Sequence, residues 1–286
     1  MSCSNGFEIV GMDPPDIKIL RTVASREFGP DPTVTLSSGT CSADSLAIDG
    51  GIAFGPNAFV PLGPWRPVNQ DDCRILYTDD ASTPASIVAV VQLFTRAEMA
   101  LFHESQCYGE VINRSAGVSP SDQFVNTLLD KLDRVIQFRN RPSFHGFASD
   151  PVGLHTVSYD ESIGKYVGLH VDTWDGTPSG QRKDAKLRVC INIGEYSRFF
   201  IFLNRSVVGM YRASFGSEGD PNSLTPNEIG KAFLSRFPSY PIVRLEVHPG
   251  CAYVAPTENI LHDGCTLDVP RPVYHTAFRG LLDYRS

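Results

Sequence analysis

The sequence lacks the features that mark membrane-spanning, secreted and nucleic-acid-binding proteins. No apolar run reaches the roughly 18 residues that a membrane-spanning helix needs, and Met1 to Gly6 lack the basic-then-apolar pattern of a secretion signal. No block of basic residues is present, and the formal net charge is -7. This balance argues against a nucleic-acid partner. We therefore expect a cytoplasmic protein without a membrane or nucleic-acid partner.

Cysteine is scarce and scattered. The seven cysteines are an odd number, and no two of them form a C-x-x-C pair. This spacing argues against a disulfide framework and against a zinc–cysteine site. We expect most of these cysteines to be small buried residues in a reducing compartment.

The first half of the chain, residues 1–150, predicts helical and irregular support. Helices are predicted to begin at Asp13, Arg96 and Ser119. The stretch 29–84 is rich in Gly, Pro, Asp, Ser and Thr, and it predicts short strands within irregular structure that could wall a pocket. Residues 86–95 form a continuous β-branched run, which is typical of a buried strand.

The second half, residues 151–286, predicts one short strand after another. A capping box at Thr225-Pro226-Asn227-Glu228 predicts one helix that ends near Phe237. The predicted strands are 154–159, 166–172, 187–193, 198–203, 207–211, 243–247, 251–255, 260–267 and 273–282. Such a series is typical of a sandwich or barrel. Because no repeat or linker separates the halves, we predict one domain over 1–286 that is mostly β with supporting helices.

The most informative stretch is Tyr166 to Gly176, which reads Y-V-G-L-H-V-D-T-W-D-G. An apolar, β-prone segment precedes His170 and Asp172, which are therefore predicted at the end of a strand. Side chains two residues apart on a strand point to the same face, so the imidazole and the carboxylate should lie side by side. His262, on a later predicted strand, is the candidate third residue. Two histidines and one carboxylate with open positions opposite form the ligand set of non-haem Fe(II) oxygenases.

With these residues the chain resembles the Fe(II)- and 2-oxoglutarate-dependent oxygenases. The iron motif of that superfamily is H-x-D/E followed, after a long gap, by H, and the matching positions are His170, Asp172 and His262. The resemblance covers roughly residues 150–286, and it implies a double-stranded β-helix (jelly-roll) core. The run 255–264 also looks like a branch of the superfamily that tailors small molecules.

The resemblance implies a reaction as well as a fold. Fe(II) would be the metal, and 2-oxoglutarate and O₂ would be the co-substrates. The site of oxidation would be an unactivated C–H bond of a small polar metabolite, such as an amino acid or a natural-product intermediate. Members that halogenate carry Gly or Ala at the carboxylate position, so Asp172 implies hydroxylation or a related desaturation or ring closure.

An arginine should hold the distal carboxylate of 2-oxoglutarate, and two arginines follow His262. Arg271 is predicted at the start of the last strand and Arg279 further along it, and their shared parity would let both point inward. We favour Arg271, because the turn before it would place it at the closed end of the barrel, deeper than the metal.

Further candidates lie around the predicted metal site. Arg188 and Asn192 share a parity on one strand, so both could face inward and bind 2-oxoglutarate or a substrate carboxylate. Arg198, on the next strand, is an alternative residue for binding the carboxylate of 2-oxoglutarate. The candidate residues of the substrate pocket are Trp174, His155 and Tyr159.

Two other functions could use the same three residues. A jelly-roll protein of the cupin type would bind another divalent metal and act as an isomerase or a binding protein without O₂ chemistry. A zinc hydrolase would keep one open position on a tetrahedral zinc. Neither alternative needs an arginine for a co-substrate carboxylate, and this difference distinguishes them from an oxygenase.

Overall fold

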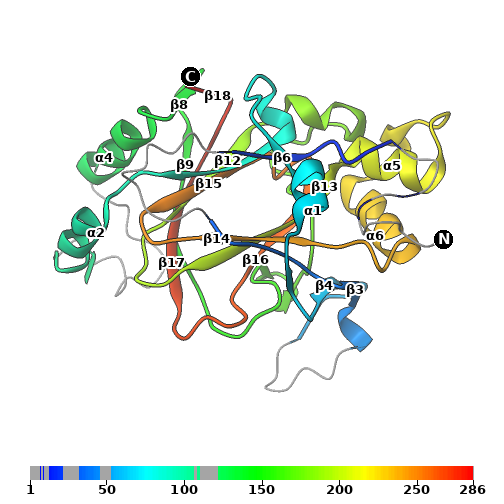
Figure 1. Ribbon diagram of the computed structural model, residues 1–286, viewed down its shortest axis with the longest axis horizontal. Helices are drawn as coiled ribbons and strands as arrows, with labels where there is room; N and C mark the ends of the chain where they lie inside the picture. The colour runs from blue at the N-terminus through cyan, green and yellow to red at the C-terminus, as the bar shows by residue number, and fades with distance from the viewer. Residues whose placement is uncertain are drawn as a thin grey trace.

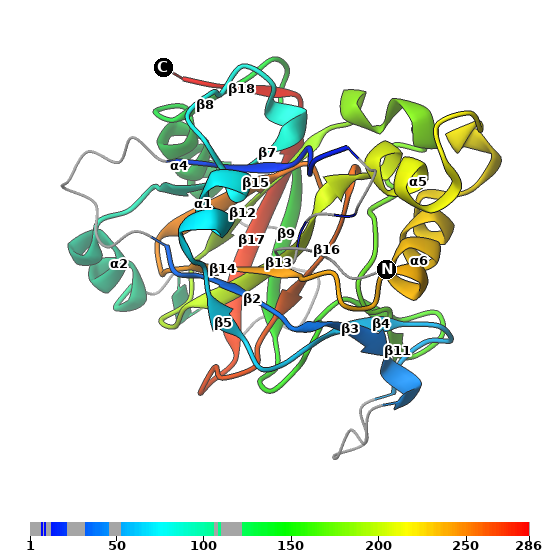
Figure 2. The same ribbon diagram turned by 45° about the vertical axis from the view of Figure 1, so that its right-hand side comes forward.

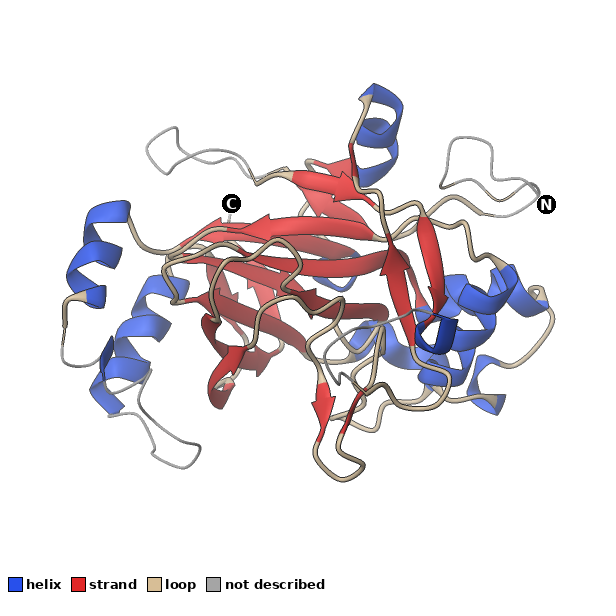
Figure 3. Ribbon diagram, turned by 90° about the horizontal axis from the view of Figure 1, so that it is seen from below, coloured by secondary structure: helices blue, strands red, loops and turns tan. Residues whose placement is uncertain are grey.

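Two β-sheets stand at the centre of the computed structural model, and helices lie at both ends of them (Figure 3). The structure describes residues 7, 9, 13–21, 32–45, 53–105, 108–109 and 122–285. Helices α2 and α4 lie at one end of the sheets, and α5 and α6 lie at the other (Figure 1). The α-helices of the described part are α1 (Gln70–Leu76), α2 (Arg96–His103), α4 (Asp122–Leu132), α5 (Val207–Phe215) and α6 (Pro226–Arg236).

The larger sheet has seven strands in the order β6-β1-β7-β15-β12-β17-β9. The strands are β6 (Tyr77–Thr78), β1 (Lys18–Leu20), β7 (Ile87–Gln92), β15 (Cys251–Ala255), β12 (Leu187–Asn192), β17 (Val273–Gly280) and β9 (Ser143–Asp150). On its outer face, Leu128 and Leu132 of α4 join a buried cluster that includes Val189. Alternate residues of β7 face this cluster and the core between the sheets, which explains its continuous apolar run.

The smaller sheet has five antiparallel strands in the order β16-β13-β14-β2-β5. The strands are β16 (Ile260–Cys265), β13 (Arg198–Ser206), β14 (Val243–Val247), β2 (Val34–Leu36) and β5 (Arg66–Pro67). The rings of Phe200 on β13 and Tyr253 on β15 stack with their centroids 4.1 Å apart, so the main core lies between the two sheets. It continues to α5 and α6 through Met210 and Phe233.

Three two-stranded pairs flank the sheets. They are β3 (Gly39–Ser42) with β4 (Phe59–Leu62), β10 (Tyr159–Asp160) with β11 (Lys165–Tyr166), and β8 (Ile136–Phe138) with β18 (Leu282–Tyr284). The pair β3–β4 lies beside β11 (Figure 2), and the N–H of Leu169 donates to the carbonyl of Phe59 at 2.8 Å. The 3₁₀ segments are η1 (Ala43–Ser45), η2 (Pro84–Ser86), η3 (Ser179–Asp184) and η4 (Pro221–Ser223). Among the described helices, none combines the length and the apolar composition of a membrane span.

Most strands predicted in the second half are confirmed. The segments 187–193, 198–203, 243–247, 251–255, 260–267 and 273–282 correspond to β12 through β17. The strand predicted over 86–95 is β7, and the helices predicted at Arg96 and Thr225 are α2 and α6. At α6, the Thr225 side chain accepts from the N–H of Glu228 and the Glu228 carboxylate accepts from the N–H of Thr225, so the capping box is formed. The mostly β class with supporting helices is therefore confirmed.

The prediction for the first half is partly wrong. The helix predicted from Asp13 is β1 at Lys18–Leu20, because Ile17 and Ile19 alternate into the core while the strand pairs in parallel with β6 and β7. The rest of that helix, 22–28, lies outside the described residues, as do residues 119–121 before α4. The first half also supplies strands to both sheets, so it is more than support.

Two further predictions need correction. The strand predicted over 207–211 is the start of α5, because the Ser206 hydroxyl accepts the N–H of Gly209 at 3.0 Å and caps a helix. The hairpin predicted around 160–164 exists, but its strands shorten to β10 and β11. In the rest of the predicted strand, residues 167–172, the chain makes one isolated bridge, at His170.

Candidate metal centre

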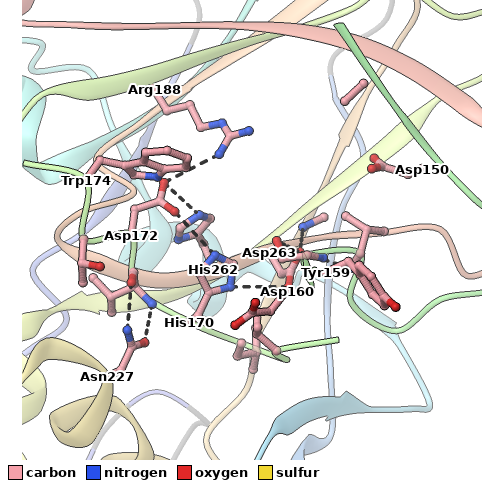
Figure 4. A pocket seen from close by; sticks show the side chains of 18 of the residues that line it. Asp150, Tyr159, Asp160, His170, Asp172, Trp174, Arg188, Asn227, His262 and Asp263 are labelled. Carbon is pink, nitrogen blue, oxygen red and sulfur yellow. Dashed lines mark hydrogen bonds and ion pairs between the residues drawn. The ribbon is translucent and has the colours of Figure 1, made fainter. Parts of the chain in front are cut away.

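His170, Asp172 and His262 meet at one point, with one possible ligand atom from each within 4.8 Å of the others. The Nε2 atom of His170 lies 3.5 Å from Oδ1 of Asp172, and the Nε2 atom of His262 lies 3.7 Å from Oδ2. The three side chains point toward one another in Figure 4. The geometry expected from the H-x-D spacing and the later histidine is therefore present.

A backbone bridge brings the two histidines together. The N–H of His170 donates to the carbonyl of His262 at 3.2 Å, and the N–H of His262 donates back at 2.8 Å. The segment after β11 thus lies along the edge strand β16 of the smaller sheet. Such a pair places side chains of the two strands on the same face.

Each histidine is oriented by a backbone carbonyl. Nδ1 of His170 lies 3.0 Å from the carbonyl of Gly168, and Nδ1 of His262 lies 3.2 Å from the carbonyl of Ile260. When Nδ1–H donates to a carbonyl, the lone pair is on Nε2. Both Nε2 atoms face Asp172, so each imidazole is turned to act as a ligand.

The charges fit a divalent cation. Oδ2 of Asp172 is buried and accepts no hydrogen bond. Burial by itself raises the pKa of Asp172, but the neighbouring His262 and His170 outweigh it and hold that pKa well below its ordinary value. Burial lowers the pKa of His262 to about 4, which leaves this imidazole neutral. Burial alone would lower the pKa of His170, but its contacts with Asp172 and Asp263 outweigh burial and raise that pKa to about 10, so a bound cation would displace a proton from this imidazole.

Two neighbouring side chains hold the segment that carries His170 and Asp172. Oδ1 of Asp263 accepts the N–H groups of Val157 and Ser158, while its Oδ2 lies 3.5 Å from Nδ1 of His170. The amide of Asn227 accepts the N–H of Val171 at 2.8 Å and donates to its carbonyl at 3.0 Å. Such outer contacts set ligand orientation and metal affinity.

The glycine before the first ligand is needed for its conformation and for space. Gly168 has φ +76, in the left-handed region that disfavours other residues. A Cβ atom there would lie 2.7 Å from the carbonyl oxygen of Phe59. This close approach lets β4 hold the segment that ends in His170.

A cavity of about 970 Å³ opens onto the three ligands. Trp174 and Tyr159 line it while remaining 63% and 53% exposed, so they stand at its mouth. Arg188 lies beside the centre, with Nη1 3.7 Å from Oδ2 of Asp172 (Figure 4). These three residues were predicted from the sequence, and all line the cavity.

A cluster of buried charged and polar side chains also lines the cavity. Arg198 is 4% exposed, and its Nη2 lies 3.1 Å from Oδ2 of Asp150. Its Nη1 contacts the Sγ atom of Cys190 at 2.7 Å, while its Nε has no hydrogen-bond partner. His275 adds Nδ1 at 3.5 Å from the same Asp150 oxygen. Burial raises the pKa of Asp150 and lowers that of His275.

Four predicted site residues lie elsewhere. Arg271 is exposed on the turn before β17, so the expectation that it points inward is wrong: the strand begins two residues later. Arg279 is buried but does not line the cavity, because Glu258 and Asp175 bind its guanidinium. Asn192 and His155 do not line the cavity either.

The side chain of Asn192 serves the fold. Its amide donates to the carbonyls of Tyr196 and Val247 at 2.9 and 2.8 Å, and it accepts the N–H of Gly194 at 3.0 Å. Both of its N–H donors are therefore used, and none is left for the carboxylate of a co-substrate. His155 is half-buried among protein groups, which corrects its placement in the substrate pocket.

Several residues of the site were not predicted. Asp263 follows His262 directly, and this adjacency was the one available signal for a second carboxylate. Asp150 and His275 could not be placed, because β9 was not predicted and a lone histidine on a strand indicates little. Glu258 becomes relevant only through contacts made in the folded chain.

A scan against protein-family models gave no match, and a search of curated proteins gave none either. Two solved structures are similar to this chain: the Kdo hydroxylase KdoO, a non-heme Fe(II) alpha-ketoglutarate-dependent dioxygenase, in complex with succinate and Fe(III), and KdoO in complex with cobalt(II). Each is 14% identical, the matches cover 69% of this chain and 80% of the other, and the TM-scores are 0.35 and 0.36. A likeness of this size carries no argument about activity, so the function proposed below rests on this chain's own side chains.

Proposed function

We propose that this chain is an Fe(II)- and 2-oxoglutarate-dependent oxygenase that oxidises a C–H bond of a small polar metabolite. The observation that carries the proposal is the arrangement of His170, Asp172 and His262, whose Nε2 and carboxylate oxygen atoms converge on one point beside a cavity. A facial set of two histidines and one carboxylate leaves positions for a chelating co-substrate and O₂. Bound Fe(II) would supply the electrons that activate O₂.

A jelly-roll core is part of the proposal. The order β9-β17-β12-β15 in the larger sheet faces the order β16-β13-β14 in the smaller one, and the bridge at His170 extends the smaller sheet beyond β16. Two four-stranded layers of this kind support a double-stranded β-helix. The candidate ligands then lie at the open end, between the layers.

We assign the distal carboxylate of 2-oxoglutarate to Arg198. A Cβ atom built on Gly264 would lie 3.1 Å from Nη2 of Arg198, so the guanidinium sits against a residue two positions beyond His262 on β16. Two residues along a strand span roughly 7 Å, which suits an extended diacid whose other end binds at the metal. Arg198 lines the cavity, and its guanidinium would give that carboxylate a charge-assisted contact.

The residues at the mouth suit a small polar substrate. Trp174 and Tyr159 offer flat apolar surface, while Arg188, Asp160 and Lys231 offer charge of both signs. Asp172 fills the position that would otherwise be open to chloride, so hydroxylation, or a related desaturation or ring closure, is the proposed outcome. The chain would orient the substrate and exclude water from the metal.

Anaerobic absorption spectroscopy tests this function. Fe(II) and 2-oxoglutarate added to the protein should give the visible charge-transfer band of a chelated 2-oxo acid, and O₂ should then release succinate when a suitable small molecule is present. Arg271→Ala, at an exposed position, is the matched arginine control and should keep the band. Fe(II) binding without a 2-oxoglutarate band would contradict the proposal and favour a metal-binding protein without O₂ chemistry.

A further inference from the structure

The loop that carries Asp172 also carries Trp174, and both ends of it rest on one turn. The N–H of Asp172 donates to the carbonyl of Thr257 at 3.1 Å, and the N–H of Asp175 donates to Oε1 of Glu258 at 2.9 Å. This turn joins β15 to β16, the strand of the third candidate ligand. The loop and that strand therefore share a support.

Glu258 is a fully buried carboxylate between two buried arginines. Its Oε2 accepts from Nη1 of Arg182 at 2.7 Å, and its Oε1 accepts from Nη2 of Arg279. Arg182 also donates to the backbone carbonyl of Asp172 at 2.9 Å. The guanidinium of Arg279 lies over the ring of Trp174, with Cζ 5.7 Å from the centroid. The Glu258 carboxylate thus holds Arg182, which binds the backbone of Asp172. It also holds Arg279, which lies over the ring of Trp174.

We infer that Glu258 is a positioning residue that couples Trp174 to the metal ligand Asp172. Contact of a bound molecule with Trp174 would shift Arg279, and through Glu258 and Arg182 it would change the alignment of the Asp172 carboxylate. Glu258 does not line the cavity, so it acts through these side chains and not on the substrate. The inference rests on the proposed function, because it takes Asp172 as a metal ligand.

The cluster is a suitable coupling element because its charges are buried and mutually dependent. Asp175 completes it, with Oδ2 3.1 Å from Nη2 of Arg279 and hydrogen-bonded to the N–H of Lys186 at 3.2 Å. Loss of the charge on Glu258 would leave Arg182 without a carboxylate partner and Arg279 with Asp175 alone. Buried ions that lose a partner reorganise, since they cannot remain unpaired.

Cobalt(II) binding and tryptophan emission test the coupling. The chain has two tryptophans, so Trp65→Phe makes Trp174 the sole emitter. In this parent, Co(II) should bind and quench the emission of Trp174. Adding Glu258→Gln, which keeps the size of the side chain, should weaken Co(II) binding by about tenfold, as for other outer contacts of metal ligands. It should also change the emission of Trp174 before metal is added.

Two comparisons separate coupling from a structural effect. Asp72→Asn removes another buried carboxylate that binds an arginine, on α1 and outside the cavity. Asp72→Asn should lower the unfolding temperature and leave the Co(II) affinity and the emission of Trp174 unchanged. Arg279→Lys keeps the charge but loses the planar contact with Trp174, so it should change the emission and the Co(II) affinity together.

The outcomes are distinct. A Glu258→Gln protein with unchanged Co(II) affinity and unchanged emission overturns the inference and leaves the metal centre standing. If Glu258→Gln does not fold, Arg279→Lys decides, and a change in emission without a change in affinity overturns the coupling. Failure of the parent to bind Co(II), or equal binding after His262→Ala, overturns the metal centre and the inference with it.

Discussion

Arg198 and Asp150 form a buried ion pair in the lining of the cavity, with 3.1 Å between Nη2 and Oδ2. The first prediction follows from the position of this guanidinium in the lining of the cavity. Arg198→Met should weaken 2-oxoglutarate binding by about 1.5–3 kcal/mol, or roughly tenfold to a hundredfold, because a charge-assisted contact is lost. Titration of the Fe(II)-loaded protein measures the dissociation constant.

A matched set of arginines checks this assignment. Arg271→Ala alters an exposed turn and should leave the dissociation constant of 2-oxoglutarate unchanged. Arg188→Met changes another guanidinium that lines the cavity, and it should affect the substrate more than the co-substrate. A loss confined to Arg188→Met would move the anchor to β12.

The second prediction concerns the metal ligands. His262→Ala should weaken Co(II) binding by more than the roughly tenfold to hundredfold that loss of an outer contact costs, because a direct ligand is removed. His248→Ala is the control, since His248 bonds to Ser197 at 3.0 Å and does not line the cavity. Calorimetric titration measures the Co(II) affinity of both variants. Equal affinity in the two variants would exclude His262 as a ligand.

The third prediction concerns the carboxylate ligand. Asp172→Gly should stop hydroxylation and leave a position on the metal that chloride can enter, because the carboxylate oxygens that face the two Nε2 atoms are removed. Product analysis by mass spectrometry in chloride and in chloride-free buffer measures the result. Halogenation would also require changes in the outer contacts, so loss of hydroxylation is the expected main effect. Native turnover in this variant would show that Asp172 is not a ligand.

The fourth prediction is a pH dependence away from the site. Burial alone would raise the pKa of Asp72, but hydrogen bonds from Arg66 and from the N–H of Asn69 hold that pKa below its ordinary value. A carboxyl with a lowered folded-state pKa contributes stability that is present above its unfolded pKa, near 4, and is lost as the pH falls through the folded value. The difference in unfolding free energy between the wild type and Asp72→Asn should therefore shrink below about pH 4.

Urea unfolding between about pH 3 and 6 measures that difference. The neighbouring variant Asp71→Asn alters an exposed carboxylate that pairs with Arg74 within the same helix, and it should show little effect on stability. A constant difference for Asp72→Asn across the range would mean that the buried ion pair does not respond to pH.

The candidate metal centre could be predicted because its signals are local. The H-x-D spacing predicts a common face for His170 and Asp172 within three residues, although the segment makes an isolated bridge and not the predicted strand. His262 lies on β16, a strand with a clear β pattern. The arginine could not be predicted in this way. Parity places a side chain inward only if the first residue of the strand is known, and Arg271 falls two residues before β17 begins.

Arg279 illustrates a second limit of sequence analysis. It is buried on the last strand, as the parity suggested, but its charge is satisfied by Glu258 and Asp175. Those carboxylates come from other segments, so only the fold brings them together. The strand prediction for 207–211 was wrong for another reason. An apolar run of five residues suits either a strand or a helix, and here the Ser206 cap stabilises the helix.

The contact of β4 with the segment before His170 has a consequence for modularity. Every proposed ligand lies after residue 169, yet the N–H groups of Gly55 and Leu169 bind the carbonyls of Tyr166 and Phe59, each at 2.8 Å. A fragment that kept only the second half would lose these backbone partners and the close packing on Gly168. Transplanting the centre into another scaffold would therefore require residues 53–62 as well, because the functional unit is discontinuous along the chain.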